Sequence, residues 1–291
     1  MAGLVKGKNI NTSKVTFSPA KVLDNGAKLV YMNHNGGMFN VQTPELDVAW
    51  DINCYDEGPY PKYSLELSFR GMDENQDIQA FHDKFLELEK KIINSGVENG
   101  SSWLKLPAKQ CTEAIVGSKF APIIKPSKDK ETGEPDGKWP STMKLKIPYR
   151  DSKFSSKFFR KNGEAINVNG ENEDDHLENV LVKGARVRCI IRCVGLWCAA
   201  GNFMCQWQLE RCEVDVPERN TACAFLPDSG DENDDADETD GATDGPRMLE
   251  DSDDDQDNVN THVSEDEVEP PKTPPKPAPK KKLLKKKGGG N

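Results

Sequence analysis

The sequence predicts a β-dominated α+β domain, built as a small closed or partly open barrel with helices packed on its outside, and then a disordered C-terminal tail. Three observations lead to this fold class. Apolar and polar residues alternate with period two in several segments, as half-buried strands require. One segment has helical spacing instead. After Phe225 the apolar residues thin out to a few scattered positions.

Charge separates the chain into two parts. It has 291 residues with 39 Lys and Arg against 49 Asp and Glu, a formal net charge of −10. Residues 228–291 hold 19 acidic and 9 basic residues, so residues 1–227 hold 30 of each sign and are neutral. The overall acidity therefore describes the tail alone and does not exclude a polyanionic partner for the folded part.

Residues 1–226 are expected to form one domain, and residues 227–291 the tail. No linker rich in Pro, Gly or Ser divides the first part, and the stretches 126–140 and 162–175 read as long surface loops. No apolar run approaches the roughly 18–20 residues of a membrane span, and the N-terminus lacks the apolar core of a signal peptide. We expect a soluble, intracellular protein with no membrane partner.

The strands are predicted from alternation. In residues 63–69, Tyr63, Leu65, Leu67 and Phe69 point to one side and the intervening polar residues to the other. Two further strands have a basic outer face. They are residues 143–147, with Lys144 and Lys146 outward, and residues 186–193, with Arg186, Arg188 and Arg192 outward. Asn-Gly pairs at 25–26 and 35–36 predict hairpin turns.

A helix is predicted where apolar residues recur at spacings of three and four between Ile78 and Ile92. Asn75 or Asp77 would cap its start, and Gly96 would end it. A shorter helix is expected around residues 110–116. Helices inserted between strands favour a mixed domain in which they pack outside a barrel.

Catalytic and metal-binding patterns are absent from the sequence. Of the eight cysteines, five lie in or beside apolar strands at Cys189, Cys193, Cys198, Cys205 and Cys212, which is typical of buried free thiols in a reducing compartment. Their spacing contains no Cys-x-x-Cys knuckle, and the four histidines lie far from them in sequence. There is no phosphate loop, nucleophile elbow or dinucleotide fingerprint. We expect a non-enzymatic protein without a metal or cofactor.

Basic residues predict a groove that follows phosphates. Its expected members are the outward residues of the two basic strands and a loop series, namely Lys144, Lys146, Arg186, Arg188, Arg192, Arg150, Lys153, Lys157, Arg160 and Lys161. The alternative is a solvated strand face whose lysines and arginines protect sheet edges. Composition favours neither.

Aromatic residues lie among these charges and are candidates for stacking on bases. Phe154, Phe158 and Phe159 are interleaved with basic residues in 153–160, and Trp197 lies beside Gly195. A second set, Phe203, Cys205, Trp207 and Leu209, shares one face at period two and is expected in the core.

The tail has two opposed blocks, an acidic one at 228–269 and a Pro-Lys run at 270–287. Tethered carboxylates could compete with phosphates for a basic groove, or they could serve only solubility. The lysines of 280–287 read either as a nuclear-import signal or as an accessory nucleic-acid contact.

Several strings resemble a phycodnavirus-like family of single-stranded DNA-binding proteins encoded by nucleocytoplasmic large DNA viruses. The strings are Tyr31-Met-Asn-His-Asn-Gly-Gly37, Val41-Gln-Thr-Pro-Glu45, Tyr63-Ser-Leu-Glu-Leu-Ser-Phe-Arg-Gly-Met-Asp73, Trp139-Pro-Ser-Thr-Met-Lys-Leu-Lys-Ile-Pro148, Lys183-Gly-Ala-Arg-Val-Arg188 and Gly195-Leu-Trp197. The resemblance runs from about residue 15 to 213. It implies an OB-fold-like barrel, that is an oligonucleotide-binding barrel, with a helical insertion, acting in viral DNA replication, recombination or repair. The residues matched to the family are Tyr31, Gln42, Thr43, Lys144, Lys146, Lys183, Arg186, Arg188 and Trp197.

The expected function is therefore binding of single strands with little sequence preference. Single-stranded DNA is the expected partner. RNA is an alternative, because stacking and charge are common to both polymers. Replication proteins would meet the tail, copies of the chain would associate on DNA, and the protein would work in the host nucleus, a cytoplasmic virus factory or the virion. The rival hypothesis is a non-enzymatic virion or scaffold protein that mediates protein–protein contacts.

Overall fold

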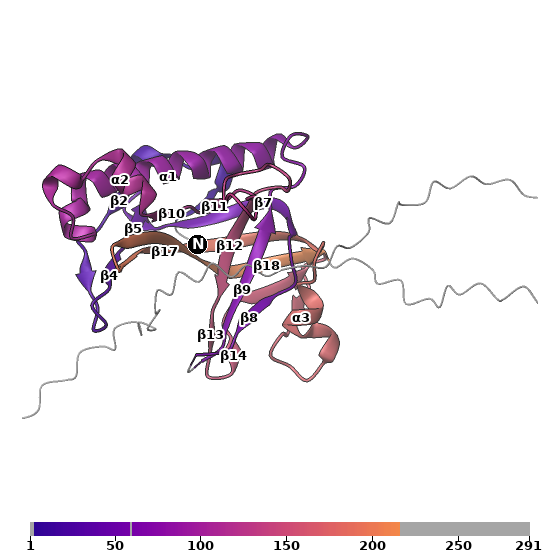
Figure 1. Cartoon of the computed structure of the whole chain (residues 1–291). Helices are drawn as coiled ribbons and strands as arrows, with labels where there is room; N and C mark the ends of the chain where they lie inside the picture. Colours follow the sequence, from indigo (N-terminus) through magenta and orange to yellow (C-terminus); the bar gives the residue numbers. More distant parts are fainter. Residues whose placement is uncertain (1–2, 59, 216–291) are drawn as a thin grey trace, which may run out of the picture.

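A computed structural model describes residues 3–58 and 60–215. The predicted acidic and Lys-rich tail lies outside these described residues. The described residues form a β-dominated α+β domain, which confirms the predicted fold class (Figure 1). None of the described helices is long and apolar enough to cross a membrane.

The elements follow one another along the chain. The strands are β1 Leu4–Lys6, β2 Val15–Phe17, β3 Lys21–Val22, β4 Lys28–Val30, β5 Met32–His34, β6 Gly37–Met38, β7 Asn40–Val48, β8 Asn53–Tyr55, β9 Lys62–Ser68, β10 Phe120–Ala121, β11 Ile124–Lys125, β12 Thr142–Ile147, β13 Tyr149–Arg150, β14 Lys153–Phe154, β15 Lys157–Arg160, β16 Ala165–Ile166, β17 Arg186–Ala199 and β18 Asn202–Asp215. The α-helices are α1 Gln76–Trp103, α2 Glu113–Ser118 and α3 Leu177–Val180, and short 3-10 turns occupy Gly7–Asn9, Thr12–Lys14, Ala108–Gln110 and Glu173–Asp175.

Five strands close into a barrel in the order β7–β9–β12–β18–β17 and back to β7. Every neighbouring pair is antiparallel except β12 and β18, which are parallel and meet only at Lys146 and Gln208. Counted from β7, the spatial order is 1-2-3-5-4, the Greek-key arrangement of an oligonucleotide-binding barrel. The predicted barrel is thus present, and a single residue pair joins its third and fifth strands.

The segment 120–125 bridges the remainder of that gap. β10 pairs with β18 at Phe203, and β11 pairs with β12 at Met143. Glu89 of α1 holds this segment, because its carboxylate accepts hydrogen bonds from the backbone N–H groups of Ile123 and Ile124 at 2.5 and 2.9 Å. Burial raises the pKa of Glu89, and the two hydrogen bonds oppose that rise.

Helix α1 lies across one end of the barrel, while α3 and the β13–β14 hairpin lie at the other (Figure 1). The Asn75 side chain caps α1 by accepting from the N–H groups of Asp77 and Ile78, which confirms the predicted start. The predicted stop at Gly96 is wrong. A Cβ there would come within 2.8 Å of Val116 Cγ1, so this glycine lets α2 pack closely against the middle of a longer helix.

The core contains the inward residues of all five barrel strands and the buried face of α1. Phe203, Cys205, Trp207 and Leu209 are buried there, as their spacing predicts. The seven described cysteines are free thiols, also as expected. The alternation of β9, β12 and β17 is confirmed as well, because their apolar residues face inward and their charged residues outward.

Stability is expected to fall in mild acid because of His34, which is 4% exposed and stacks on Phe39 with ring centroids 4.9 Å apart. Burial lowers the pKa of His34, the charge of Lys14 lowers it further, and a backbone hydrogen bond at Asn11 partly offsets both. The unfolded chain, with a pKa of about 6.5, therefore binds a proton that the folded chain does not. Stabilisation from neutral His34 is complete above that pKa and is lost as pH falls below it.

The thermal midpoints at pH 7.5 and pH 5.5 would measure this effect. His34→Gln should unfold with a smaller difference between the two midpoints than the parent chain. An equal difference in both proteins would assign the acid sensitivity to other groups.

Candidate nucleic-acid interface

The exterior of β9, β11 and β12 is rich in lysine. In β12 the residues Met143, Leu145 and Ile147 face the core, so Lys144 and Lys146 face outward. The register places Lys144 beside Glu66 and Lys146 beside Ser64, which belong to the outward row of β9. Lys125 of β11 pairs with Thr142 in the same outward row, and Lys62 begins the outward row of β9. We call Lys62, Lys125, Lys144 and Lys146 the lysine face.

Electrostatics at this face favour an added anion. Desolvation lowers the pKa of Lys125, Glu66 raises it, and the like charge of Lys144 lowers it again. Glu66 is the one carboxylate in the outward rows of β9, β11 and β12 as the structure describes them. A phosphate bound here would therefore relieve the repulsion between Lys125 and Lys144.

The connection from β7 to β9 adds exposed aromatic rings. Trp50 is 56% exposed, and the Lys183 ammonium lies 5.3 Å from its ring centroid. The backbone N–H of Lys183 donates to the Asp51 carboxylate at 2.8 Å, which holds the two segments together. Tyr60 is 66% exposed. The sequence pointed to Lys183 but not to these rings, because neither Trp50 nor Tyr60 lies within a run of basic residues.

The β17 arginines are on a different part of the barrel and are paired with carboxylates. β18 separates β17 from β12 on one side, and β7 with β9 separates them on the other. The ion pairs are Arg186 with Glu45 and Asp47 at 3.8 and 3.9 Å, Arg188 with Glu213 at 3.1 Å and Arg192 with Glu210 at 2.7 Å. The predicted groove, which would have joined the basic faces of β12 and β17, does not form. The two strands lie apart in the barrel, and carboxylates pair with the β17 arginines.

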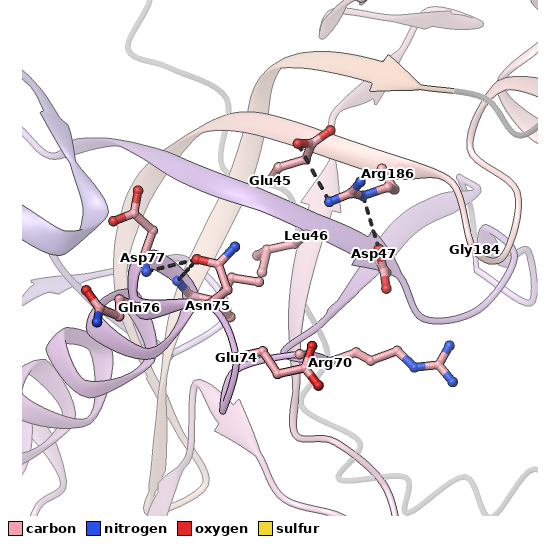
Figure 2. Close-up of a pocket in the computed structure, with 12 residues that line it drawn as sticks. Glu45, Leu46, Asp47, Arg70, Glu74, Asn75, Gln76, Asp77, Gly184 and Arg186 are labelled. Carbon is pink, nitrogen blue, oxygen red and sulfur yellow. Dashed lines mark hydrogen bonds and ion pairs between the residues drawn. The ribbon is translucent and has the colours of Figure 1, made fainter.

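A hollow of about 850 Å³ lies beside Arg186, between β7 and the start of α1, and Figure 2 shows the residues that line it. Glu45 and Asp47 line it and point their carboxylates at the Arg186 guanidinium. Glu74 and Asp77 add two more negative charges on the helix side, and Lys8 pairs with Asp77 at 2.8 Å. Phosphates would meet carboxylates here, so the hollow is a poor site for a polyanion.

The β13–β14 hairpin extends the basic surface from the end of β12. Arg150 and Lys153 pair with each other in its backbone ladder and are exposed. Phe154 is half-buried and packs on Tyr63 and Tyr149, with ring centroids 4.8 Å away in each case. The ring predicted to stack on bases thus supports the hairpin instead, while the two cations remain accessible.

The other predicted rings and charges are distributed around the molecule. Phe158 is 1% exposed and belongs to the core, so the prediction that it stacks on bases is not supported. Trp197 is 6% exposed and packs in a small cluster with Ala27 and Leu29, which removes it from the surface as well. Tyr31 lies between β4 and β5 and is 42% exposed.

Strand β15 and the residue that follows it, Lys161, carry the remaining predicted cations. Lys157 is exposed and pairs in register with Arg211 of β18. Arg160 is paired with Asp175 at 2.9 Å, and Lys161 bridges Asp215 at 2.8 Å and Glu45 at 3.3 Å. No cluster of three or more metal-ligating side chains occurs in the part of the chain that the structure describes.

Topology and side chains together define an oligonucleotide-binding type of barrel whose second and third strands present lysines. No protein-family model matches the sequence, and no curated protein matches it either. The resemblance to the viral family therefore stays a prediction.

Among solved structures, the chain is similar to the single-stranded DNA-binding protein of bacteriophage Enc34. The complex with ssDNA has 14% identity over 70% of this chain and 97% of that one, with a TM-score of 0.39. The C-terminal truncation has 15% identity over 70% and 97%, with a TM-score of 0.38, and a third structure has 15% identity over 72% and 96%, with a TM-score of 0.37. At this identity and TM-score, functional conclusions rest on the chain's own strands and side chains.

Proposed function

We propose that this chain binds single-stranded nucleic acid, and single-stranded DNA in particular, along the lysine face. The observation that carries the proposal is the position of these lysines on β9, on β12 and on β11, which pairs with β12. In oligonucleotide-binding barrels the face of the second and third strands, with the loop that joins the first two, is the ligand surface. Here that face carries four lysines against Glu66, and that loop carries Trp50 and Tyr60.

Binding of this kind would have little sequence preference. Lysines neutralise phosphates, which are the same in every sequence, and aromatic rings stack on any base. A non-catalytic role in viral DNA replication, recombination or repair fits such a protein, and so does an intracellular location at the site of viral DNA synthesis. Association of copies along one strand would appear as a sigmoidal binding curve.

The rival proposal is a virion or scaffold protein that uses its barrel for protein–protein contacts. The exterior of β7 and β17, where arginines are paired with carboxylates, suits the polar rim of a protein–protein interface. The two proposals differ in what they require of the lysine face, since a scaffold has no need for a surplus of positive charge there.

Fluorescence anisotropy with a labelled oligo-dT at two salt concentrations separates these proposals. Single-strand binding should weaken steeply with salt, because neutralised phosphates release counterions. A duplex of equal length would serve as the comparison, and oligo-rU competition would report the preference between DNA and RNA. A flat salt response, or no binding to any of the three, would contradict nucleic-acid binding and favour the scaffold.

Removing the acidic segment 228–269 is expected to raise the affinity for short oligonucleotides. Its carboxylates would otherwise compete with phosphates for the lysine face at high local concentration. The control is a full-length chain in which the Asp and Glu residues of this segment become Asn and Gln, which preserves the tether and removes the charge. Equal affinity in the parent, the deletion variant and the neutralised variant would contradict this competition. The segment would then serve solubility or the docking of replication proteins.

A further inference from the structure

The five tryptophans of the chain fall into two groups. Trp103, Trp197 and Trp207 are 4%, 6% and 1% exposed and belong to the interior. Trp50 and Trp139 are 56% and 64% exposed. Tryptophan is among the residues most strongly buried on average, so two largely exposed indoles in one small domain call for a cause.

Each exposed indole has a lysine ammonium near its ring. Lys183 lies 5.3 Å from the ring centroid of Trp50, and Lys138 lies 6.0 Å from that of Trp139. Both distances fall within cation–π range. Because more than half of each indole is exposed, ring surface remains for a second planar group. Each pair thus combines a stacking surface with a positive charge beside it.

Both tryptophans lie next to the lysine face. Trp50 follows Ala49, whose backbone N–H donates to the carbonyl of Glu66 at 2.9 Å on the β7 side of β9. Trp139 precedes Ser141, whose carbonyl accepts from the N–H of Phe69 at 2.9 Å on the β12 side. The backbone segments that carry the two tryptophans therefore lie on either side of β9, the strand whose outward row belongs to the lysine face.

The loop that carries Trp139 is ordered without a core of its own. Between β11 and β12, the Asp129 carboxylate accepts from the N–H groups of Glu131 and Thr132 at 3.0 and 2.8 Å. Ser127 donates to the Asp136 carboxylate at 2.5 Å. Trp139 is 64% exposed in a loop where almost every residue is exposed. Its ring is free to serve a ligand.

We propose that the indoles of Trp50 and Trp139 are stacking platforms for bases of a single strand whose phosphates lie along the lysine face. This inference rests on the proposed function and adds the places where bases are held. Isolated exposed hydrophobic residues are common and need no explanation. These two differ because each is paired with a lysine and both adjoin the same basic strands. The ligand group is the π-face of a nucleobase.

The test uses the full chain with Trp50→Ala and Trp139→Ala, each titrated with oligo-dT at two salt concentrations. Each variant should bind roughly 5- to 150-fold more weakly, the range that corresponds to loss of one stacked base at about 1–3 kcal/mol. The dependence on salt should not change, because no phosphate contact is removed. Trp50→Phe and Trp139→Phe should retain most of the affinity. Met38→Ala, which removes a 62% exposed side chain from the separate β2–β5–β6 sheet, is the matched control.

A second measurement is quenching of tryptophan fluorescence by oligo-dT. The parent should be quenched on binding, and the double variant Trp50→Phe with Trp139→Phe should lose the quenching, because its remaining indoles are buried. If the parent binds oligo-dT while either alanine variant binds within about twofold of it, the two-platform arrangement is overturned and the proposed function stands. If the parent binds no oligonucleotide, the proposed function itself fails.

Discussion

Replacing Lys144 and Lys146 together by glutamine is expected to weaken oligo-dT binding about tenfold or more at moderate salt. Both side chains point outward from β12 beside Glu66 and Ser64, so the exchange removes positive charge from the centre of the lysine face without touching the core. The slope of log affinity against log salt should become shallower by about 1.4, since each phosphate contact on a single strand contributes about 0.7.

Arg186→Gln with Arg188→Gln is the matched control for this prediction. It removes the same net charge from another strand exterior, where the arginines already face Glu45, Asp47 and Glu213. We expect a loss of less than about twofold, because these cations are held by carboxylates. Equal losses in the two double variants would mean that binding follows net charge instead of a defined face. Unchanged binding of oligo-dT by the Lys144→Gln and Lys146→Gln double variant would show that the lysine face is not the binding site.

Trp207→Ala is expected to lower the free energy of unfolding by about 3–5 kcal/mol. The indole is 1% exposed and packs between Phe39 and Phe85, with ring centroids 5.4 and 5.1 Å away. Its loss would leave a cavity between the barrel and α1 that rigid neighbours fill only in part. Urea unfolding, with the slope against denaturant fitted separately for each variant, measures the change.

Trp139→Ala provides the comparison within the same residue type. Its indole is 64% exposed, so stability should change by no more than about 0.5 kcal/mol. Trp207→Phe should recover much of the loss seen in Trp207→Ala, because a ring again fills most of the space. A cost below about 1 kcal/mol for Trp207→Ala would show that the core around α1 rearranges to close the cavity.

The strands and helices were largely predictable because their signals are local. Period two in residues 63–69 and 143–147 predicts β9 and β12 together with the side of each strand that faces the core. The Asn35-Gly36 pair predicts the β5–β6 hairpin, where both residues adopt positive φ. Helix α1 was predicted with its cap, but its end was predicted wrongly. Gly96 does not end the helix, because its lack of a side chain makes room for Val116 of α2.

The candidate site was predictable only in part. Lys144 and Lys146 were identified correctly as outward charges, and Lys183 lies beside an exposed ring. The stacking residues were misjudged, since Phe158 and Trp197 look in sequence like rings on a basic surface but are buried in the fold. Trp50 and Trp139 carry no local signal that separates them from buried tryptophans.

By itself, the sequence determined the β-dominated class, the outward and inward sides of the main strands, the capped start of the long helix and the neutrality of residues 1–227 beside an acidic tail. Each of these depends on residues a few positions apart or on composition. Only the tertiary structure decided which charges meet. The barrel places Glu45 and Asp47 of β7 against Arg186, about 140 residues later in the chain, and sets β12 beside β9, whose one carboxylate is Glu66. Neighbours of this kind are set by long-range backbone pairing, which alternation along a single strand does not encode.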